Sequence, residues 1–285
     1  MMRELTDISV IKEICNKYGF KFKKGLGQNF LTERNVIIDT VEGAGIDEET
    51  SVIEIGPGFG SLTQVLLQYA KDVTSVEIDN SLIEVLNDLF GDNEKFTLIN
   101  NDVLKIDLND IIKNDKTVVV ANLPYYITTP IITELLEKKY PLKSITVMVQ
   151  KEVAARMCAE PGTKDYGALT CLINYYADAH IIRHVKAGCF MPAPKVDSSV
   201  VCLKLLDKPR VAPKDEKTYF SVVKAVFLQR RKTLLNTLTN ILNMEKSDME
   251  KIIVSAGYDP MVRGEKLSVH DFVKIADKLA EFKNL

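Results

Sequence analysis

The sequence predicts an α/β fold, in which a doubly wound sheet is followed by a small all-helical domain. Three observations predict it. From Val52 to Leu205, short apolar runs alternate with stretches of helical spacing, which is typical of a sheet covered by helices on both faces. A glycine-rich turn directly follows the first apolar run. After Thr218, only helical spacing remains.

Seven strands are expected in the alternating region. They cover residues 51–55, 73–77, 96–100, 117–121, 145–150, 181–186 and 200–205. Helices are expected between them at residues 62–69, 81–89 and 130–138. Ahead of the last strand, residues 191–199 contain two closely spaced prolines, which resist both helix and strand and therefore predict an extended loop.

A domain boundary is expected near Pro209, in a polar segment punctuated by prolines. Residues 1–208 would form the sheet domain and residues 209–285 the helical domain. In the helical domain, Ser247 and Ser268 are expected to cap helices, because a serine oxygen accepts from the free N–H groups at a helix start.

The composition is that of a globular protein with a sizeable core, with 46% apolar and 27% charged residues. The N-terminus lacks a basic start followed by an apolar run, and no segment approaches the roughly 20 apolar residues of a membrane helix. The chain is therefore expected to be soluble and cytoplasmic. Its formal net charge of −2 does not indicate a nucleic-acid-binding protein, so any RNA contact must come from local basic clusters.

No metal site is expected. The cysteines are scattered, odd in number and without a CxxC pair, which favours free thiols: Cys15, Cys158, Cys171, Cys189 and Cys202. The three histidines have neither metal-binding nor catalytic spacing: His180, His184 and His270.

The glycine-rich turn is the most informative segment. It reads ExGxGxG, from Glu54 through Gly56 and Gly58 to Gly60. Glycine lets the backbone approach a ligand closely, because no Cβ intervenes. A dinucleotide fingerprint would need its third glycine where Ser61 stands, so the spacing favours a methionine-moiety pocket over a pyrophosphate cradle. A purely structural turn is the alternative.

Acidic residues follow the next two strands. The carboxylate of Glu77 can accept hydrogen bonds from both hydroxyls of a ribose, a role that NAD enzymes share. Asp102 can accept from an adenine amino group, while the Val103 backbone reads a ring nitrogen; a plain helix cap is the alternative for Asp102. These positions and the glycine turn all follow strands, where open α/β sheets bind their ligands.

The segment Asn122, Leu123, Pro124 and Tyr125 follows the fourth strand and indicates methylation of an adenine amino group. The lone pair of adenine N6 is delocalised into the ring, so this nitrogen is a poor nucleophile. An asparagine oxygen and a backbone carbonyl can accept its hydrogens and favour a tetrahedral, nucleophilic nitrogen. Tyr125 offers a ring for the base to stack on. Alignment with a sulfonium methyl donor should then suffice without a general base.

A second aromatic face is expected from the loop at residues 190–194. Phe190 begins this loop and could stack on the other face of an extruded base. A phenylalanine buried in the core is the alternative, and the sequence does not favour either. The candidate catalytic residues are therefore Asn122, Leu123, Pro124, Tyr125 and Phe190.

Together these residues closely resemble the ribosomal small-subunit RNA adenine N6,N6-dimethyltransferase family of the KsgA type, over nearly the whole chain. Further matching motifs lie at residues 27–31, 149–154, 166–169, 190–198, 227–234 and 263–268. The resemblance implies a Rossmann-like class I methyltransferase domain with a mostly parallel sheet, and S-adenosyl-L-methionine as cofactor. The expected cofactor-binding residues are Gln28, Asn29, Leu31, Gly56, Gly58, Glu77, Asp102, Val103 and Asn122.

The resemblance also implies a substrate. The family adds two methyl groups to each of two adjacent adenosines in a hairpin near the 3′ end of small-subunit (16S) rRNA, during assembly of the 30S subunit. Phosphate contacts are expected from basic clusters, for each of which a solvated charged face is the alternative. The candidate RNA-binding residues are Lys23, Lys24, Arg230, Arg231, Lys232 and Arg263.

Other functions remain open. A related branch methylates a large-subunit rRNA adenine and confers macrolide resistance, although QRRKTL at residues 229–234 favours the small-subunit branch. The chain could act chiefly as an assembly factor. A DNA N6-adenine methyltransferase would usually carry proline in place of Leu123, and an NAD oxidoreductase is disfavoured by the misplaced third glycine. A monomer is expected, because no long apolar surface stripe is evident.

Overall fold

The computed structural model describes residues 3–23, 25 and 27–283, and the chain divides into two compact units. Unit 1 contains Met1–Ala154 and Ala179–Leu205, and unit 2 contains Ala155–Asp178 and Leu206–Leu285. The second segment of unit 2 begins at Leu206, close to the boundary expected near Pro209. Residues 155–178, which the sequence assigned to the sheet domain, group with the helical unit instead, because their contacts are made there; for example, the Tyr166 hydroxyl donates to the Leu267 carbonyl (2.8 Å).

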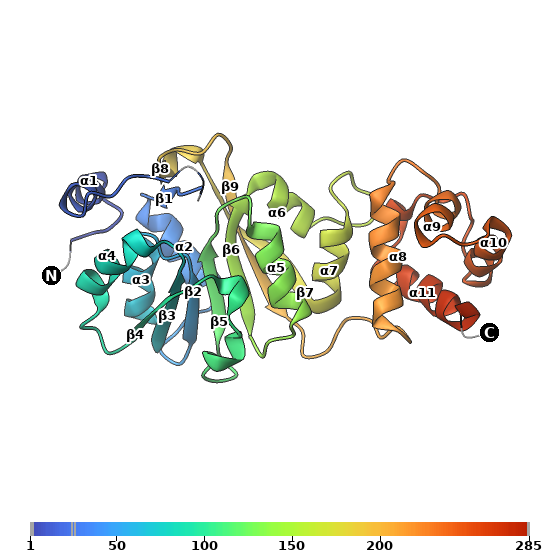
Figure 1. Ribbon diagram of the computed structural model, residues 1–285, viewed down its shortest axis with the longest axis horizontal. Helices are drawn as coiled ribbons and strands as arrows, with labels where there is room; N and C mark the ends of the chain where they lie inside the picture. Colours follow the sequence, from blue (N-terminus) through green and yellow to red (C-terminus); the bar gives the residue numbers. More distant parts are fainter. Residues whose placement is uncertain (1–2, 24, 26, 284–285) are drawn as a thin grey trace. The chain divides into compact units, whose positions relative to one another are not determined.

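Unit 1 is built on a seven-stranded sheet of order β4-β3-β2-β5-β6-β9-β7 (Figure 1). The strands are β2 (Ser51–Ile55), β3 (Asp72–Glu77), β4 (Phe96–Asn100), β5 (Val118–Asn122), β6 (Ser144–Gln150), β7 (Ala177–Val185) and β9 (Ser198–Leu205). The five strands from β4 to β6 are parallel, and β9 runs antiparallel to β6. The expected mostly parallel, Rossmann-like sheet is therefore confirmed, with strand ends shifted by a few residues.

The helices of unit 1 explain where a ligand can bind. They are α1 (Ile8–Lys17), α2 (Arg34–Gly43), α3 (Ser61–Tyr69), α4 (Asn80–Phe90), α5 (Thr128–Glu137) and the start of α6 (Lys151–Met157). The chain proceeds from β2 outward to β3 and β4, and then returns to β5 on the other side of β2. Right-handed crossovers therefore place α5 on the face opposite α3 and α4. This reversal between β2 and β5 opens a crevice at the carboxyl ends of the strands.

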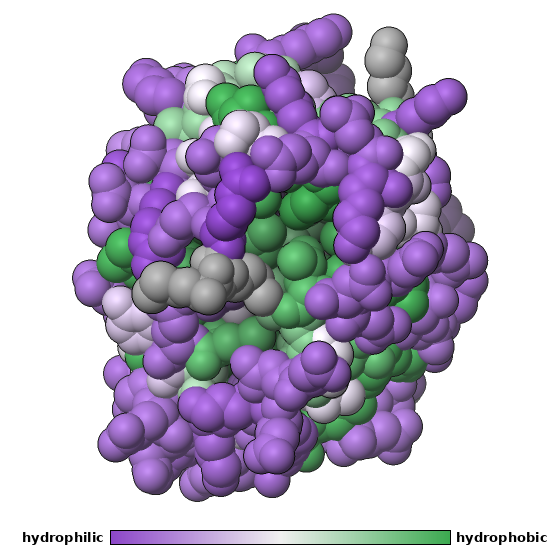
Figure 2. Space-filling view, turned by 90° about the vertical axis from the view of Figure 1, so that its left-hand side faces the viewer, coloured by the Kyte–Doolittle hydropathy of each residue, from purple (hydrophilic) through white to green (hydrophobic). Residues whose placement is uncertain are grey.

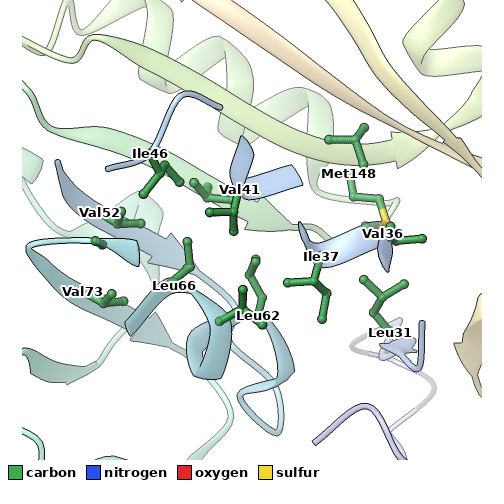
Figure 3. Packing of buried hydrophobic residues seen from close by; sticks show 14 of the residues in the cluster. Leu31, Val36, Ile37, Val41, Ile46, Val52, Leu62, Leu66, Val73 and Met148 are labelled. Atoms are coloured by element: carbon green, nitrogen blue, oxygen red, sulfur yellow. The ribbon is translucent and has the colours of Figure 1, made fainter. Parts of the chain in front are cut away.

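A continuous apolar core holds α2 and α3 against the sheet. In Figure 3, Ile37 and Val41 of α2 point toward Leu62 and Leu66 of α3, with Val52 of β2 beside them. These side chains are at most 9% exposed. Truncating a fully buried leucine or isoleucine in such a core costs about 2–5 kcal/mol. The core therefore fixes the helix that follows the glycine turn.

A separate two-stranded sheet joins β1 (Phe30–Leu31) to β8 (Phe190–Met191) in antiparallel register. The sequence analysis predicted neither strand. Each is two residues long, and its partner lies far away along the chain, so no local periodicity marks it. The segment after β8 lacks regular structure up to β9, which confirms the extended loop expected around the two prolines.

Unit 2 is helical apart from its short share of β7. Its helices are α7 (Ala168–Tyr176), α8 (Glu216–Leu228), α9 (Leu234–Leu242), α10 (Lys246–Ser255) and α11 (Val269–Lys283). The expected cap at Ser268 is confirmed, because Asp271 N donates to the Ser268 hydroxyl and Ser268 N donates to the Asp271 carboxylate. The expected cap at Ser247 is wrong: Glu245 occupies the N-cap position and α10 begins at Lys246, so Ser247 lies inside the helix.

No described helix is long and apolar enough to cross a membrane. Within the described part of the chain, no group of three or more His, Cys, Asp or Glu side chains could hold a metal ion. All five cysteines are free. Cys171 and Cys202 are buried, and this burial raises the pKa of both thiols. They are consequently poor nucleophiles at neutral pH.

Candidate active site

A cavity lies at the carboxyl ends of β2, β3, β4 and β5, where the strand order reverses. It encloses about 1290 Å³ of empty space, part of which is open to solvent. Its lining comes from the loop before β1, the glycine turn and the segments after β3, β4 and β5. The face of unit 1 seen in Figure 2 is hollowed, with hydrophobic side chains in the hollow and hydrophilic ones around it. Mostly apolar cavities with a few polar groups are typical small-molecule sites.

The glycine turn leaves its backbone open to this cavity. Gly56 has φ +71°, a conformation that L side chains rarely adopt, and an added Cβ would meet no atom within 4 Å. Gly58 is required for a different reason: a Cβ there would lie 2.7 Å from the Phe30 ring. Both glycines line the cavity, as the sequence predicted. Gly60, with φ +84°, then caps α3.

Glu77 ends β3 and lines the cavity with a carboxylate that is 5% exposed. Asp79 N donates to its Oε1 (2.7 Å), and Gly58 N approaches its Oε2 (3.4 Å). Burial raises the pKa of this carboxyl, while the two N–H groups oppose that shift. Because each carboxylate oxygen carries two lone pairs, both keep one for a ligand hydroxyl.

Asp79 is a functional residue that sequence reasoning missed. Its Oδ1 accepts from the Lys23 ammonium (2.5 Å) and caps α4 through Ser81 N (3.0 Å). Its Oδ2 accepts from Gln28 Nε2 (2.7 Å). Although burial raises the pKa of Asp79, the hydrogen bonds from these groups lower it below the ordinary value overall. Asp79 therefore anchors the loop before β1 to the segment between β3 and α4.

Asp102 and Val103 lie at the cavity edge after β4, as predicted. Asp102 is also a helix cap, because its Oδ1 accepts from Leu104 N (3.1 Å) at the start of the 3-10 helix Val103–Lys105. The two interpretations of Asp102 are thus compatible. Its Oδ2 is 3.7 Å from the Lys105 ammonium, an exposed pair in which the carboxylate keeps free lone pairs.

Asn122 is the last residue of β5, and its orientation is fixed by the loop before β1. Its Nδ2 donates to the Asn29 carbonyl (3.2 Å), so its Oδ1 is left as an acceptor. Asn29 is itself held by a hydrogen bond from its Nδ2 to the Gly27 carbonyl (3.0 Å). Both asparagines line the cavity, together with Gln28 and Leu31. The loop before β1 therefore both lines the cavity and fixes the side chain of Asn122.

A tight turn follows Asn122 and fixes the positions of Tyr125 and Tyr126. The Pro124 carbonyl accepts from Ile127 N (3.1 Å) and from the Thr128 hydroxyl (3.1 Å), which closes the turn. Tyr125 is half-buried, and its hydroxyl shares a hydrogen bond with Ser198 (2.8 Å), so its ring is fixed. Burial raises the pKa of the Tyr125 phenol. Leu123, Pro124 and Tyr125 all line the cavity, as the sequence predicted.

The structure does not bring Phe190 to the cavity. This residue is 5% exposed and packs in the core beside Leu31, its partner in the β1–β8 sheet. The interpretation of Phe190 as a stacking residue for the base therefore needs correction, and the core alternative holds. Backbone pairing with β1 turns the ring inward, which the sequence of the loop alone could not show.

The candidate RNA-binding residues lie in two places. In unit 1, Lys23 forms an ion pair with Asp79, while Lys24 lies outside the described residues. In unit 2, the basic run 230–232 forms the turn between α8 and α9, where Arg230 donates to the Lys164 carbonyl (2.8 Å). The other three candidate RNA-binding side chains of unit 2 are exposed: Arg231, Lys232 and Arg263.

Glu54 is a buried acid under the glycine turn. It is 1% exposed, and its Oε2 accepts from the hydroxyls of Thr63 of α3 and Ser75 of β3 (both 2.7 Å). Its Oε1 has no hydrogen-bond partner among the described residues. Burial raises its pKa from 4.5 to about 7, and the nearby charge of Glu77 adds to this shift.

Folding therefore favours the protonated form of Glu54. The associated stability is fully present below the unfolded pKa, near 4.5, and is lost as the pH rises through about 7. Relative to a Glu54→Gln variant, the native protein should lose about 3 kcal/mol of unfolding free energy from about pH 4.5 to about pH 8. Urea unfolding of both proteins at about pH 5 and about pH 8 measures this difference. A difference that is the same at both pH values would contradict the assignment.

Comparisons with known proteins show the family of the chain. The model of the family "Ribosomal RNA adenine dimethylase" matches residues 19–281. The chain belongs to this family. It is 50% identical over 284 residues to the "Ribosomal RNA small subunit methyltransferase A" of Clostridium perfringens, covering 99% of both chains. It is also 50% identical to the protein of the same name from Clostridium acetobutylicum, covering 94% of this chain and 97% of that one.

Two solved structures share the fold. A dimethyladenosine transferase from Plasmodium falciparum superposes with a TM-score of 0.72 and 25% identity, over 90% of this chain and 98% of that one. The 23S rRNA methyltransferase ErmE superposes with a TM-score of 0.67 and 25% identity, over 88% of this chain and 100% of that one. Membership of the family makes the chain an S-adenosylmethionine-dependent methyltransferase, as the resemblance implied.

The residues present fit this cofactor. The open backbone at Gly56 would admit the methionine moiety, the free lone pairs of Glu77 would accept from the ribose hydroxyls, and Asp102 and Val103, which line the same cavity, would hold the adenine. When bound, S-adenosylmethionine supplies a methyl group on a sulfonium sulfur, which is a good leaving group. Asn122 lines the same cavity.

Proposed function

We propose that this chain dimethylates N6 of two adjacent adenosines in the hairpin near the 3′ end of small-subunit rRNA. It would do so as a monomer in the cytoplasm, within an immature 30S subunit. One observation carries the proposal: the Asn122 amide, whose Oδ1 has no hydrogen bond to the residues that the structure describes, and the ring of Tyr125 line the same cavity as the expected cofactor-binding residues. The curated relatives at 50% identity, which are named for the small subunit, support the choice of substrate.

The chain's own residues activate the target nitrogen. Asn122 Oδ1 and a backbone carbonyl of the following turn accept the two amino hydrogens of adenine N6. Pro124 O is already occupied by two donors, so the backbone acceptor is the Leu123 carbonyl. Two acceptors on the amino group withdraw its lone pair from the ring and favour a tetrahedral nitrogen.

Tyr125 holds the base in line for transfer. Its ring is tied at the hydroxyl to Ser198, so it offers a fixed surface for stacking at little further entropic cost. The N6 lone pair forms the new bond to the methyl carbon as the bond from that carbon to sulfur breaks. The nitrogen then releases one proton to solvent. A second round on the same nitrogen gives the dimethylated base.

Affinity for the subunit comes in part from unit 2. Arg231, Lys232 and Arg263 are exposed, and they can reach phosphates without first breaking an ion pair seen in the described structure. Phosphate contacts of this kind supply salt-dependent affinity but little sequence choice. These three basic side chains provide local positive charge in a chain whose net charge of −2 does not by itself attract RNA.

Purified protein, radiolabelled S-adenosylmethionine and small subunits that lack this methylation test the proposal. After RNA digestion, label is expected in N6,N6-dimethyladenosine. Label on large-subunit RNA instead would assign the chain to the macrolide-resistance type. Tight subunit binding without label would favour the assembly-factor role, and both results would overturn the proposal.

A further inference from the structure

Tyr126 is an exposed aromatic side chain at the mouth of the catalytic cavity. It is 60% exposed, yet it lines the same cavity as Asn122 and Tyr125. Its hydroxyl makes no hydrogen bond to any residue that the structure describes. A large aromatic ring left in water beside a catalytic turn has no role in the core, so its surface is available to a ligand.

The turn after β5 directs the two adjacent tyrosines differently. The hydrogen bond from Ile127 N to the Pro124 carbonyl places Tyr125 and Tyr126 at the two central positions of the turn. Tyr125 is half-buried and tied to Ser198, whereas Tyr126 remains exposed. The turn therefore presents one ring inside the cavity and one ring at its rim.

The ring of Tyr126 lies beside Gly27. A Cβ added at Gly27 would lie 3.6 Å from Cδ1 and 3.7 Å from Cε1 of this ring, so this side of the ring is next to the loop before β1. That loop also fixes Asn122 through the Asn29 carbonyl. The position of Tyr126 is thereby linked to the catalytic amide, while the rest of its surface stays exposed.

We propose that Tyr126 is an RNA-binding residue that stacks on the nucleobase next to the adenosine being methylated. This inference rests on the proposed function, in which two adenosines are adjacent. Extruding one base leaves its neighbour unstacked on one side, and an aromatic ring can replace the lost stacking. The rim position of Tyr126, one residue after the ring that receives the target, matches the place of such a neighbour.

Three variants separate stacking from packing. Tyr126→Ala should lower kcat/KM for unmethylated small subunits about tenfold, mainly through KM, because base–aromatic stacking has this magnitude. Tyr126→Phe should retain native activity. Tyr126→Leu keeps an apolar side chain against Gly27 but lacks the aromatic ring, and it should behave like the alanine variant. The Kd for S-adenosylmethionine should stay within about twofold in all three.

A double-mutant cycle identifies the ligand. In ribosomal small subunits that carry uridine in place of one of the two adjacent adenosines, the base next to the remaining adenosine stacks more weakly on an aromatic ring. We expect this replacement to lower kcat/KM of the native enzyme but to have little further effect on Tyr126→Ala. If the losses from the uridine replacement and from Tyr126→Ala simply add, or if Tyr126→Ala has an unchanged KM, the stacking role is overturned. The proposed function stays intact in that case, provided that the native enzyme still labels the small-subunit RNA. Absence of label with the native enzyme would instead count against both.

Discussion

Replacing Asn122 with alanine is expected to lower kcat for methyl transfer to small-subunit RNA about 10²- to 10³-fold. This is the usual cost of removing one preorganised group that acts on the reacting atom. The variant loses the Oδ1 that the hydrogen bond from Nδ2 to Asn29 leaves free for the target amino group. Single-turnover methylation with saturating S-adenosylmethionine measures the effect on the chemical step.

Asn87→Ala is the matched control for this prediction. Asn87 is an exposed asparagine on α4 that does not line the cavity, and the same truncation there should leave kcat unchanged. The Asn122→Ala variant should also keep its thermal unfolding midpoint within a few degrees. A kcat within threefold of the native value would show that Asn122 does not activate the nitrogen.

Replacing Glu77 with alanine should raise the Kd for S-adenosylmethionine about 100-fold. The variant loses acceptors for both ribose hydroxyls, and a hydrogen bond to a charged group contributes about 1.5–3 kcal/mol. It also leaves the N–H groups of Asp79 and Gly58 without their acceptor at the cavity wall. Isothermal titration with S-adenosylmethionine measures the change directly.

Glu84→Ala controls for the loss of a negative charge in the same region. Glu84 is exposed on α4, and its removal should leave the Kd unchanged. Glu77→Asp keeps the charge but shortens the side chain, so its Kd should lie between those of the native and alanine proteins. Equal affinity in all four proteins would remove Glu77 from the cofactor site.

The sequence was sufficient to predict the sheet. Strand β5 is an apolar run that ends at the polar Asn122, and β2 is largely apolar, apart from Ser51 and Glu54, and ends at a glycine. The same logic located the cavity, because residues that follow parallel strands meet at one edge. Gly56, Glu77 and Asn122 were therefore predicted from their positions alone, and all three line the cavity.

Contacts between distant segments could not be predicted. The inward orientation of Phe190 depends on the pairing of β8 with β1, and two-residue strands leave no periodic signal. Asp79 reads as an ordinary helix cap, and only the folded chain shows that Lys23 and Gln28 converge on it. Likewise, the sequence NLPYY contains two tyrosines in a row, and the turn decides which one is exposed.

The most direct test of the central claim is mass spectrometry of the 3′-terminal fragment of small-subunit rRNA after reaction with the native enzyme and with Asn122→Ala. The native enzyme should convert two adjacent adenosines to their N6,N6-dimethyl forms, and the variant should leave both unmodified over the same period. Methylation of a different nucleotide, or equal modification by both proteins, would contradict the assignment of this cavity as an adenine N6 methylation site.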